Sequence, residues 1–299
     1  MMNYHVPVML NECIDGLNIQ PDGIYVDVTF GGGGHSKEIL KHLEEGKLIA
    51  FDQDEKAEVN KPIDDRFLFI NHNFRFLRNN LLYHGMNAIN GLLADLGVSS
   101  RQFDDQQRGF SYRFESDLDM RMNQGKETTA ADIVNKYPQD ELRRVLGDYG
   151  EFRNAAALAS AIISYRSKSP IATTGDMLDS VRDFIPSRMR NKFLSRLFQA
   201  LRMELNRETE FLKDMLLQAT EMLVKGGRIV IITYHSVEDR LVKNFFKSGN
   251  FEGREEKDFY GNPVSPFILV NKKVITPSEE EISTNRRARS AKLRIAEKK

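Results

Sequence analysis

The sequence predicts an α/β fold, in which a parallel sheet is covered by helices on both faces and the chain is interrupted by an all-helical subdomain. Apolar runs rich in β-branched residues alternate with helical patterns near both ends of the 299-residue chain, which is typical of a parallel sheet. Between Asp95 and Arg228 helical patterns dominate and there is little strand character. One crossover normally contains a single helix. We therefore place an insertion at 106–205 and expect 1–105 and 206–299 to form one discontinuous domain.

Strands are indicated by short apolar runs bounded by turn residues. The first run, 24–29, is followed after one residue, Phe30, by four consecutive glycines, and two later runs end in an acid, Asp52 and Asp95. After the insertion, a Gly-Gly turn introduces a further strong strand. The segments expected to contribute to the sheet are 24–29, 47–52, 67–70, 89–95, 226–236, 267–276 and 291–296.

Helices are indicated by apolar residues spaced three and four apart. A helix is expected at about 36–45 after the glycines, with Gly46 as its stop. Ser236 and Asp239 form a start signal for a helix through 237–246. Within and after the insertion, helical patterns occupy 130–137, 139–147, 153–166, 175–184 and 188–224.

The composition is that of a globular protein, with 40% hydrophobic and 29% charged residues. The net charge is zero, which argues against a general polyanion binder, although Lys and Arg outnumber acids in 182–207 and 285–299. With Cys13 as the only cysteine, no intramolecular disulfide can form, and a cytoplasmic location is expected. The first 25 residues lack a signal-peptide pattern, and no apolar run is long enough to span a membrane.

The glycine run at 31–34 indicates a place where another group approaches the main chain. Lys37 does not complete a P-loop, and the dinucleotide fingerprint fails at its third glycine. S-adenosylmethionine is a third candidate, because its ribose hydroxyls can meet an acid that ends the second strand, and Asp52 follows Gly31 by 21 residues. That spacing suits a nicotinamide cofactor equally well, so these residues predict only a nucleoside-like cofactor. A tight structural turn is the alternative without a ligand.

Three carboxylates are expected at one edge of the sheet: Asp27 in the first strand, and Asp52 and Asp95, which end two later strands. Open α/β sheets bind ligands at the carboxyl ends of their strands. A carboxylate there can accept hydrogen bonds from an amine and aim its lone pair at an alkylating methyl group. The alternative is that these acids cap helices or fix loops.

Long motifs occur along almost the whole chain. They are HVPVMLNE (5–12), VDVTFGGGGHS (26–36), FDQD (51–54), LLADLGVSSRQFDDQQRGFSYRFESDLDMRMN (92–123), FQALRMELN (198–206), GGRIVIITYHSVEDRLVK (226–243) and NRRARSAKLR (285–294). Together these motifs resemble the bacterial 16S ribosomal RNA cytosine-N4 methyltransferases, the RsmH (formerly MraW) family. The resemblance implies a class I (Rossmann-like) methyltransferase sheet that uses S-adenosylmethionine to methylate N4 of a cytosine in the decoding region of the small ribosomal subunit.

The same resemblance implies cofactor-binding residues. Phe74 is expected to contact the adenosine, or else to be ordinary core, and His35 is expected to orient the methionine end, or else to be structural. The family commonly has proline where this chain has Arg101 and Asp117, which leaves the shape of that loop open. The cofactor-binding positions carried over are Gly33, Gly34, His35, Asp52, Phe74, Asp95 and Gln102.

The catalytic residues are expected at the ends of the fourth and fifth strands. Methylation at cytosine C5 needs a cysteine nucleophile, and Cys13 is poorly placed for one, which leaves transfer to nitrogen or oxygen. We expect Asp95 to hold the amine, Tyr234 to stack on the base, and His235 to contact the base or accept the released proton. The alternative for His235 is that it only caps the following helix. No metal site is expected, because the six histidines lack ligand spacing.

An RNA partner is expected, because a target cytosine must be unpaired or flipped to present N4. The insertion is expected to recognise RNA. Its basic helices and the tail at 285–294 are expected to bind RNA phosphates. The alternative is that these basic side chains only face solvent. Two rivals remain open, a nicotinamide-dependent oxidoreductase and a non-catalytic RNA-binding module. The oligomeric state is not predicted.

Overall fold

The computed structural model describes residues 7–98, 103, 105–261 and 264–299, and these form two compact units. The sheet unit comprises residues up to Gly97 together with Glu210–Lys299, and the helical unit comprises Val98–Thr209. The range expected for the insertion, 106–205, lies inside the helical unit. Its predicted role in RNA recognition stays a prediction.

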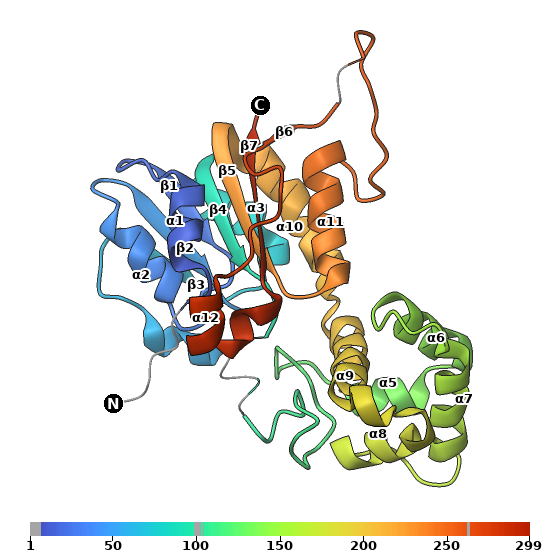
Figure 1. Cartoon of the computed structure of the whole chain (residues 1–299). Helices are drawn as coiled ribbons and strands as arrows, with labels where there is room; N and C mark the ends of the chain where they lie inside the picture. Colours follow the sequence, from blue (N-terminus) through green and yellow to red (C-terminus); the bar gives the residue numbers. More distant parts are fainter. Residues whose placement is uncertain (1–6, 99–102, 104, 262–263) are drawn as a thin grey trace. The chain divides into compact units, whose positions relative to one another are not determined.

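The sheet unit contains one seven-stranded sheet in the order β3-β2-β1-β4-β5-β7-β6 (Figure 1). Neighbours among β1 to β5 pair in parallel, whereas β7 is antiparallel to β5 and β6. Because β1 lies between β2 and β4, the strand order reverses there, and such a switch point is where open α/β sheets bind ligands. The predicted fold class is confirmed. The strands are β1 (Ile24–Asp27), β2 (Lys47–Phe51), β3 (Phe67–Ile70), β4 (Ile89–Asp95), β5 (Leu223–Thr233), β6 (Phe267–Leu269) and β7 (Lys292–Lys298).

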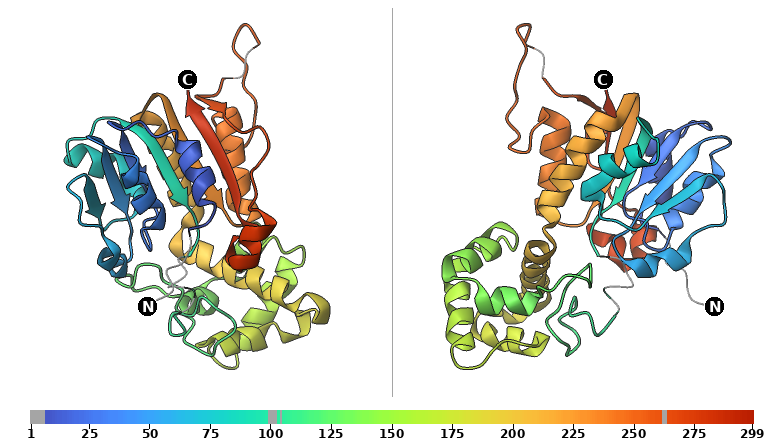
Figure 2. Two further views of the ribbon diagram at one scale, coloured as in Figure 1. Left: turned by 60° about the vertical axis from the view of Figure 1, so that its left-hand side comes forward. Right: turned by 180° about the vertical axis from the view of Figure 1, so that it is seen from behind.

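Helices cover both faces of the sheet (Figure 2), since successive side chains of a strand point to opposite faces. Val26 and Ile49 belong to a core that includes α3 (Leu77–Tyr83), α10 (Glu208–Met222) and α11 (Ser236–Ser248). On the opposite face, alternate strand residues pack with α1 (Leu10–Leu17) and α2 (Gly34–Lys41). Shorter elements of this unit are α12 (Glu279–Thr284) and the 3-10 helices η1 (Glu55–Asn60), η2 (Phe74–Phe76) and η5 (Arg286–Ser290).

The helical unit is organised around its own apolar core. Thr129 begins α5 with a capping box that it forms with Asp132. Near the end of α9, Asn206 accepts a hydrogen bond from the Met122 amide and donates one to the Met120 carbonyl, which ties the segment before α5 to this helix. The helices are α5 (Ala130–Lys136), α6 (Gln139–Asp148), α7 (Ala155–Arg166), α8 (Thr174–Ser180), η3 (Arg182–Phe184), η4 (Ser187–Met189) and α9 (Arg190–Asn206).

Several element boundaries differ from the sequence predictions. The continuous pattern at 188–224 is interrupted at Arg207, which has φ 53 and separates α9 from α10. The cap of α11 is His235 rather than Ser236, because the His235 ring accepts the Glu238 amide. The expected strand at 267–276 is only β6, followed by a single bridge from Ile275 to Leu293. Among the described residues, no helix has the length and apolarity to cross a membrane.

An ion pair joins α11 to the sheet. Asp239 on α11 is 9% exposed, and it accepts hydrogen bonds from Arg294 on β7 at 2.7 and 3.2 Å and from Lys292 at 3.4 Å. Burial raises the pKa of Asp239, but the hydrogen bonds and charge of Arg294 and the charge of Lys292 lower it by more, so the net pKa lies below its ordinary value. The ionised carboxylate therefore stabilises the fold.

We expect Asp239→Asn to lower the free energy of unfolding at pH 7 by about 2 kcal/mol, because Arg294 loses a charged acceptor. The folded-state pKa is depressed, so this stability is present above the unfolded pKa of about 4 and is lost as pH falls through the folded value. Urea unfolding at pH 7 and in acid measures both effects, and the difference from wild type should shrink in acid. As a control, Glu221→Gln removes an exposed partner of Arg78 and should cost less than about 0.5 kcal/mol. Equal stability of Asp239→Asn and wild type at pH 7 would contradict the assignment.

Candidate functional site

The glycine loop after β1 leaves part of its main chain bare. Gly31 and Gly33 have φ 50 and 74, a region that favours glycine. A Cβ on Gly34 would lie 2.2 Å from Pro7 Cγ, so this glycine is required by the fold itself. A Cβ on Gly32, in contrast, would meet no described atom within 4 Å. The main chain at Gly32 is thus open to another molecule.

Asp52, directly after β2, holds the glycine loop. Its Oδ2 accepts a hydrogen bond from the Gly31 amide at 2.8 Å, and its Oδ1 accepts one from the Asp54 amide at 2.8 Å. The Asn60 side chain donates to the Gly31 carbonyl at 2.9 Å from the same region. Burial raises the pKa of Asp52 to about 6. Each carboxylate oxygen can accept a further hydrogen bond, so Asp52 can serve both the loop and a ligand hydroxyl.

Asp27 has a structural role at the end of β1. It is 2% exposed, and it accepts hydrogen bonds from the Ser36 hydroxyl at 2.7 Å and the Thr29 amide at 3.0 Å. Burial raises its pKa. The Thr29 hydroxyl in turn accepts the Asp95 amide at 2.6 Å. These bonds connect the carboxyl ends of β1 and β4, and they favour the loop-fixing interpretation of Asp27.

Asp95, the last residue of β4, accepts a hydrogen bond from a residue that follows the neighbouring strand, β5. The Tyr234 hydroxyl donates to Asp95 Oδ1 at 2.7 Å. Burial and then the Asp95 charge raise the pKa of Tyr234 strongly, so the phenol stays protonated and remains a donor. This contact was missed by sequence reasoning. The available signal was that Asp95 ends β4 and Tyr234 directly follows β5, the parallel strand next to it.

His235 lies at the start of α11 and is partly buried. Its Nδ1 accepts the Glu238 amide at 3.4 Å, and its Nε2 lies 3.0 Å from Glu238 Oε1 without the alignment of a hydrogen bond. Glu238 Oε2 accepts the Tyr234 amide at 3.3 Å. His235 therefore caps the helix. Its contact with a base stays a prediction.

The remaining predicted cofactor residues fall into different environments. The His35 ring lies 3.0 Å from the Val8 carbonyl oxygen and is 7% exposed, so it supports the segment before α1. Phe74 begins η2, is partly buried and packs against the core. Asn73 beside it donates to Gln53 at 2.8 Å, which joins the segment after β3 to the segment after β2. Gln102 lies outside the described residues.

Comparison with known proteins identifies relatives over the full length. A family model described as MraW methylase family matches residues 2–299. Ribosomal RNA small subunit methyltransferase H of Phocaeicola vulgatus is 56% identical, covering 99% of this chain and 98% of the relative. The protein of the same name from Flavobacterium johnsoniae is 55% identical, with the same shares covered.

Solved structures show weaker likeness. An rRNA methylase from Streptococcus thermophilus has 12% sequence identity and a TM-score of 0.42, covering 97% of this chain and 93% of that one. NSun6 from Pyrococcus horikoshii has 12% identity and a TM-score of 0.43, covering 98% of this chain and 52% of that one. The full-length match of the family model and identities above one half over nearly the whole chain decide the relationship: this chain belongs to the MraW methylase family.

Proposed function

We propose that this protein transfers a methyl group from S-adenosylmethionine to the exocyclic N4 of a cytosine in the decoding region of 16S ribosomal RNA, on the small ribosomal subunit. The observation that carries the proposal is the Tyr234-bound Asp95 carboxylate, which ends β4 next to the switch point of a methylase-family sheet. Because the chain belongs to this methylase family, the alternative hypothesis of a nicotinamide-dependent oxidoreductase is excluded. The proposed substrate places the protein with ribosomes, in the cytoplasm.

The residues of the glycine loop fit S-adenosylmethionine. When bound, this cofactor supplies a methyl group activated by its sulfonium. The open main chain at Gly32 accommodates a ligand at close approach, and Asp52 has acceptor capacity for ribose hydroxyls beyond its two amide contacts. Phe74 is an apolar surface near the end of β3 that suits an adenine ring. No phosphate-binding feature is required, because this cofactor has no phosphate.

Transfer to nitrogen rather than to ring carbon is favoured by the state of the only cysteine. Methylation at C5 requires a thiolate that attacks the ring. Cys13 is fully buried, and burial, followed by the charge of Asp95, raises the pKa of its thiol well above the ordinary value. A buried thiol with a raised pKa is inert as a nucleophile. The chain therefore lacks the group that C5 chemistry needs.

Asp95 is the residue best placed to orient the amine. Its carboxylate can accept the N–H groups of N4 and so direct the nitrogen lone pair toward the methyl group. The Tyr234 hydroxyl occupies one side of Asp95 Oδ1 and fixes the rotamer of the carboxylate. Tyr234 thus has a positioning role through its hydroxyl, beside the predicted stacking of its ring on the base.

The function is tested by incubating small subunits from cells that lack the modification with the protein and S-adenosylmethionine. We expect N4-methylcytidine in the digested 16S RNA, identified by chromatography coupled to mass spectrometry. Subunits that already carry the modification serve as the control and should gain no methyl group. Formation of C5-methylcytidine, or no methylcytidine at all, would overturn the proposal.

Cofactor affinity should depend on the ionisation of Asp52. Its pKa is about 6, and ribose hydroxyls bind the ionised form, so affinity should be about tenfold weaker at pH 5 than at pH 7. Calorimetry with S-adenosylmethionine across this range measures the effect. Asp52→Asn should bind more weakly at pH 7 and lose the pH dependence. As a control, Asp64→Asn should leave the profile unchanged, because Arg66 lowers the pKa of Asp64 to about 2. A flat wild-type profile would remove Asp52 from the cofactor site.

Asp95 and Tyr234 should act as one unit in catalysis. We expect Asp95→Asn to lower kcat about a hundredfold or more, because the amine loses its charged acceptor, and Tyr234→Phe to lower kcat about tenfold. The double variant should be little worse than Asp95→Asn alone. Single-turnover methylation measures all three, with Tyr83→Phe, an exposed tyrosine of the same unit, as the matched control. Wild-type rates in Asp95→Asn would exclude a catalytic role for this residue.

A further inference from the structure

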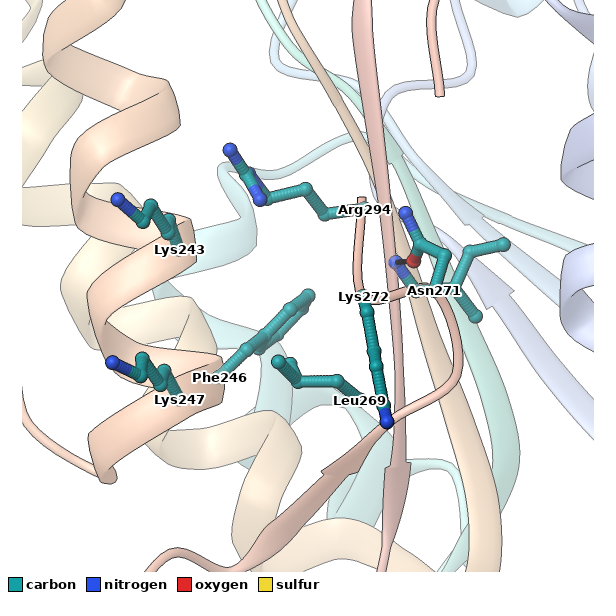
Figure 3. Close-up of a pocket in the computed structure, with 8 residues that line it drawn as sticks. Lys243, Phe246, Lys247, Leu269, Asn271, Lys272 and Arg294 are labelled. Carbon is teal, nitrogen blue, oxygen red and sulfur yellow. Dashed lines mark hydrogen bonds between the residues drawn. The ribbon is translucent and has the colours of Figure 1, made fainter. Parts of the chain in front are cut away.

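A cationic pocket lies between α11 and the β6–β7 edge of the sheet unit (Figure 3). Its cavity volume is about 200 Å³, smaller than most sites for drug-sized ligands but sufficient for a phosphate group. Figure 3 shows Phe246 of α11 and Leu269 of β6 next to each other at its floor, with Lys243 and Lys247 on the α11 side and Lys272, from the segment after β6, on the other side. The lining residues are Lys243, Phe246, Lys247, Leu269, Asn271, Lys272, Arg294 and Ile295.

The four cationic side chains around this pocket differ in whether they have a carboxylate partner. Arg294 is bonded to Asp239, and Lys247 lies 2.5 Å from Glu255, so two of its four cations have carboxylate partners. Among the residues that the structure describes, no partner forms a hydrogen bond or an ion pair with the side chain of Lys243 or of Lys272. The pocket therefore carries a surplus of positive charge beside an apolar floor, where a low local dielectric strengthens attraction for an anion.

The segment that carries Lys272 is fixed to the sheet. The Asn271 side chain accepts the Ile295 amide at 2.7 Å and donates to the Lys273 carbonyl at 2.8 Å and the Leu293 carbonyl at 3.3 Å. Its polar atoms are thereby used to hold the loop after β6 against β7. The base of Lys272 is consequently held in place opposite Lys243.

The positive charge continues along α11. Arg240, Lys243 and Lys247 are spaced three and four residues apart, which places them on one side of the helix. We call these three residues the α11 cation stripe. At 1.5 Å per residue, Lys243 lies about 10 Å along the axis from Ser236, the first residue of α11. Because α11 begins two residues after Tyr234, the stripe leads from the candidate active site to the pocket. Such an extended row suits a polyanion better than a single small ion.

We propose that this pocket binds a backbone phosphate of the RNA substrate, a few nucleotides from the cytosine that is methylated. The inference rests on the proposed function, since it requires an RNA to lie at the carboxyl edge of the sheet. Lys243 and Lys272 clamp the phosphate from opposite sides, and the α11 cation stripe attracts the adjoining backbone. These contacts position the RNA without reading its sequence.

The test uses the full-length protein and Lys243→Ala/Lys272→Ala. We expect its affinity for a 16S RNA fragment containing the target, measured by fluorescence anisotropy, to fall about tenfold or more, as for loss of charged contacts. The slope of log affinity against log salt should decrease in magnitude by about 0.7 to 1, which corresponds to one phosphate. Affinity for S-adenosylmethionine should be unchanged, and Lys243→Arg/Lys272→Arg should retain RNA binding.

The matched control is Lys47→Ala/Lys225→Ala, which removes the same charge from exposed positions near the amino ends of β2 and β5. It should bind RNA within about twofold of wild type, as expected when no specific phosphate contact is lost. Equal RNA affinity of the pocket variant and this control would overturn the proposal. The proposal would also be overturned if inorganic phosphate bound to the pocket and left the affinity for RNA unchanged, because the pocket would then be a site for free anions. Failure of wild type to methylate subunits would instead refute the proposed function, independently of these binding results.

Discussion

The hydrogen bond from the Asp95 amide to the Thr29 hydroxyl, at 2.6 Å, holds together the part of the molecule on which the candidate site depends. It joins the ends of β1 and β4 where the strand order reverses. Thr29 is itself oriented by the buried Asp27, which also binds the first turn of α2 through Ser36. One connected set of bonds therefore places the glycine loop and the Asp95 carboxylate at the same edge. A ligand bound by the loop and a base held by Asp95 are brought together by this connection.

The same edge concentrates carboxylates that are costly to bury. The pKa values of Asp27 and Asp52 are both raised by desolvation, and the charge of Asp27 adds to the effect on Asp52. Main-chain amides offset part of this cost by donating to both residues. Perturbed carboxylates gathered in this way are typical of functional sites. Hydrogen bonds from ligand hydroxyls would offset more of the cost at Asp52, so cofactor binding and stability of this edge are coupled.

Sequence reasoning succeeded where the information is local. Periodicity and turn residues predicted the strands that end in Asp52 and Asp95, and the glycine run predicted the bare main chain next to them. It failed where distant segments decide the outcome. The bond from Tyr234 to Asp95 joins residues 139 positions apart, and the support of His35 by the Val8 carbonyl depends on how the N-terminal segment packs. The break at Arg207 lacks glycine or proline, so no local pattern indicates it.

The helix α11 connects three features that the sequence presents separately. Its first turn is capped by His235 beside the Asp95–Tyr234 pair, and the same turn is fixed to β7 through Asp239 and Arg294. Its third and fourth turns carry Lys243 and Lys247. Because a helix has a fixed rise per residue, the distance between the candidate active site and the cationic pocket is set by the helix itself. The Asp239 ion pair prevents the helix from sliding along the sheet. A phosphate bound at the pocket would therefore define where the neighbouring nucleotides fall relative to Asp95, and binding energy gained far from the reacting nitrogen would be used to position it.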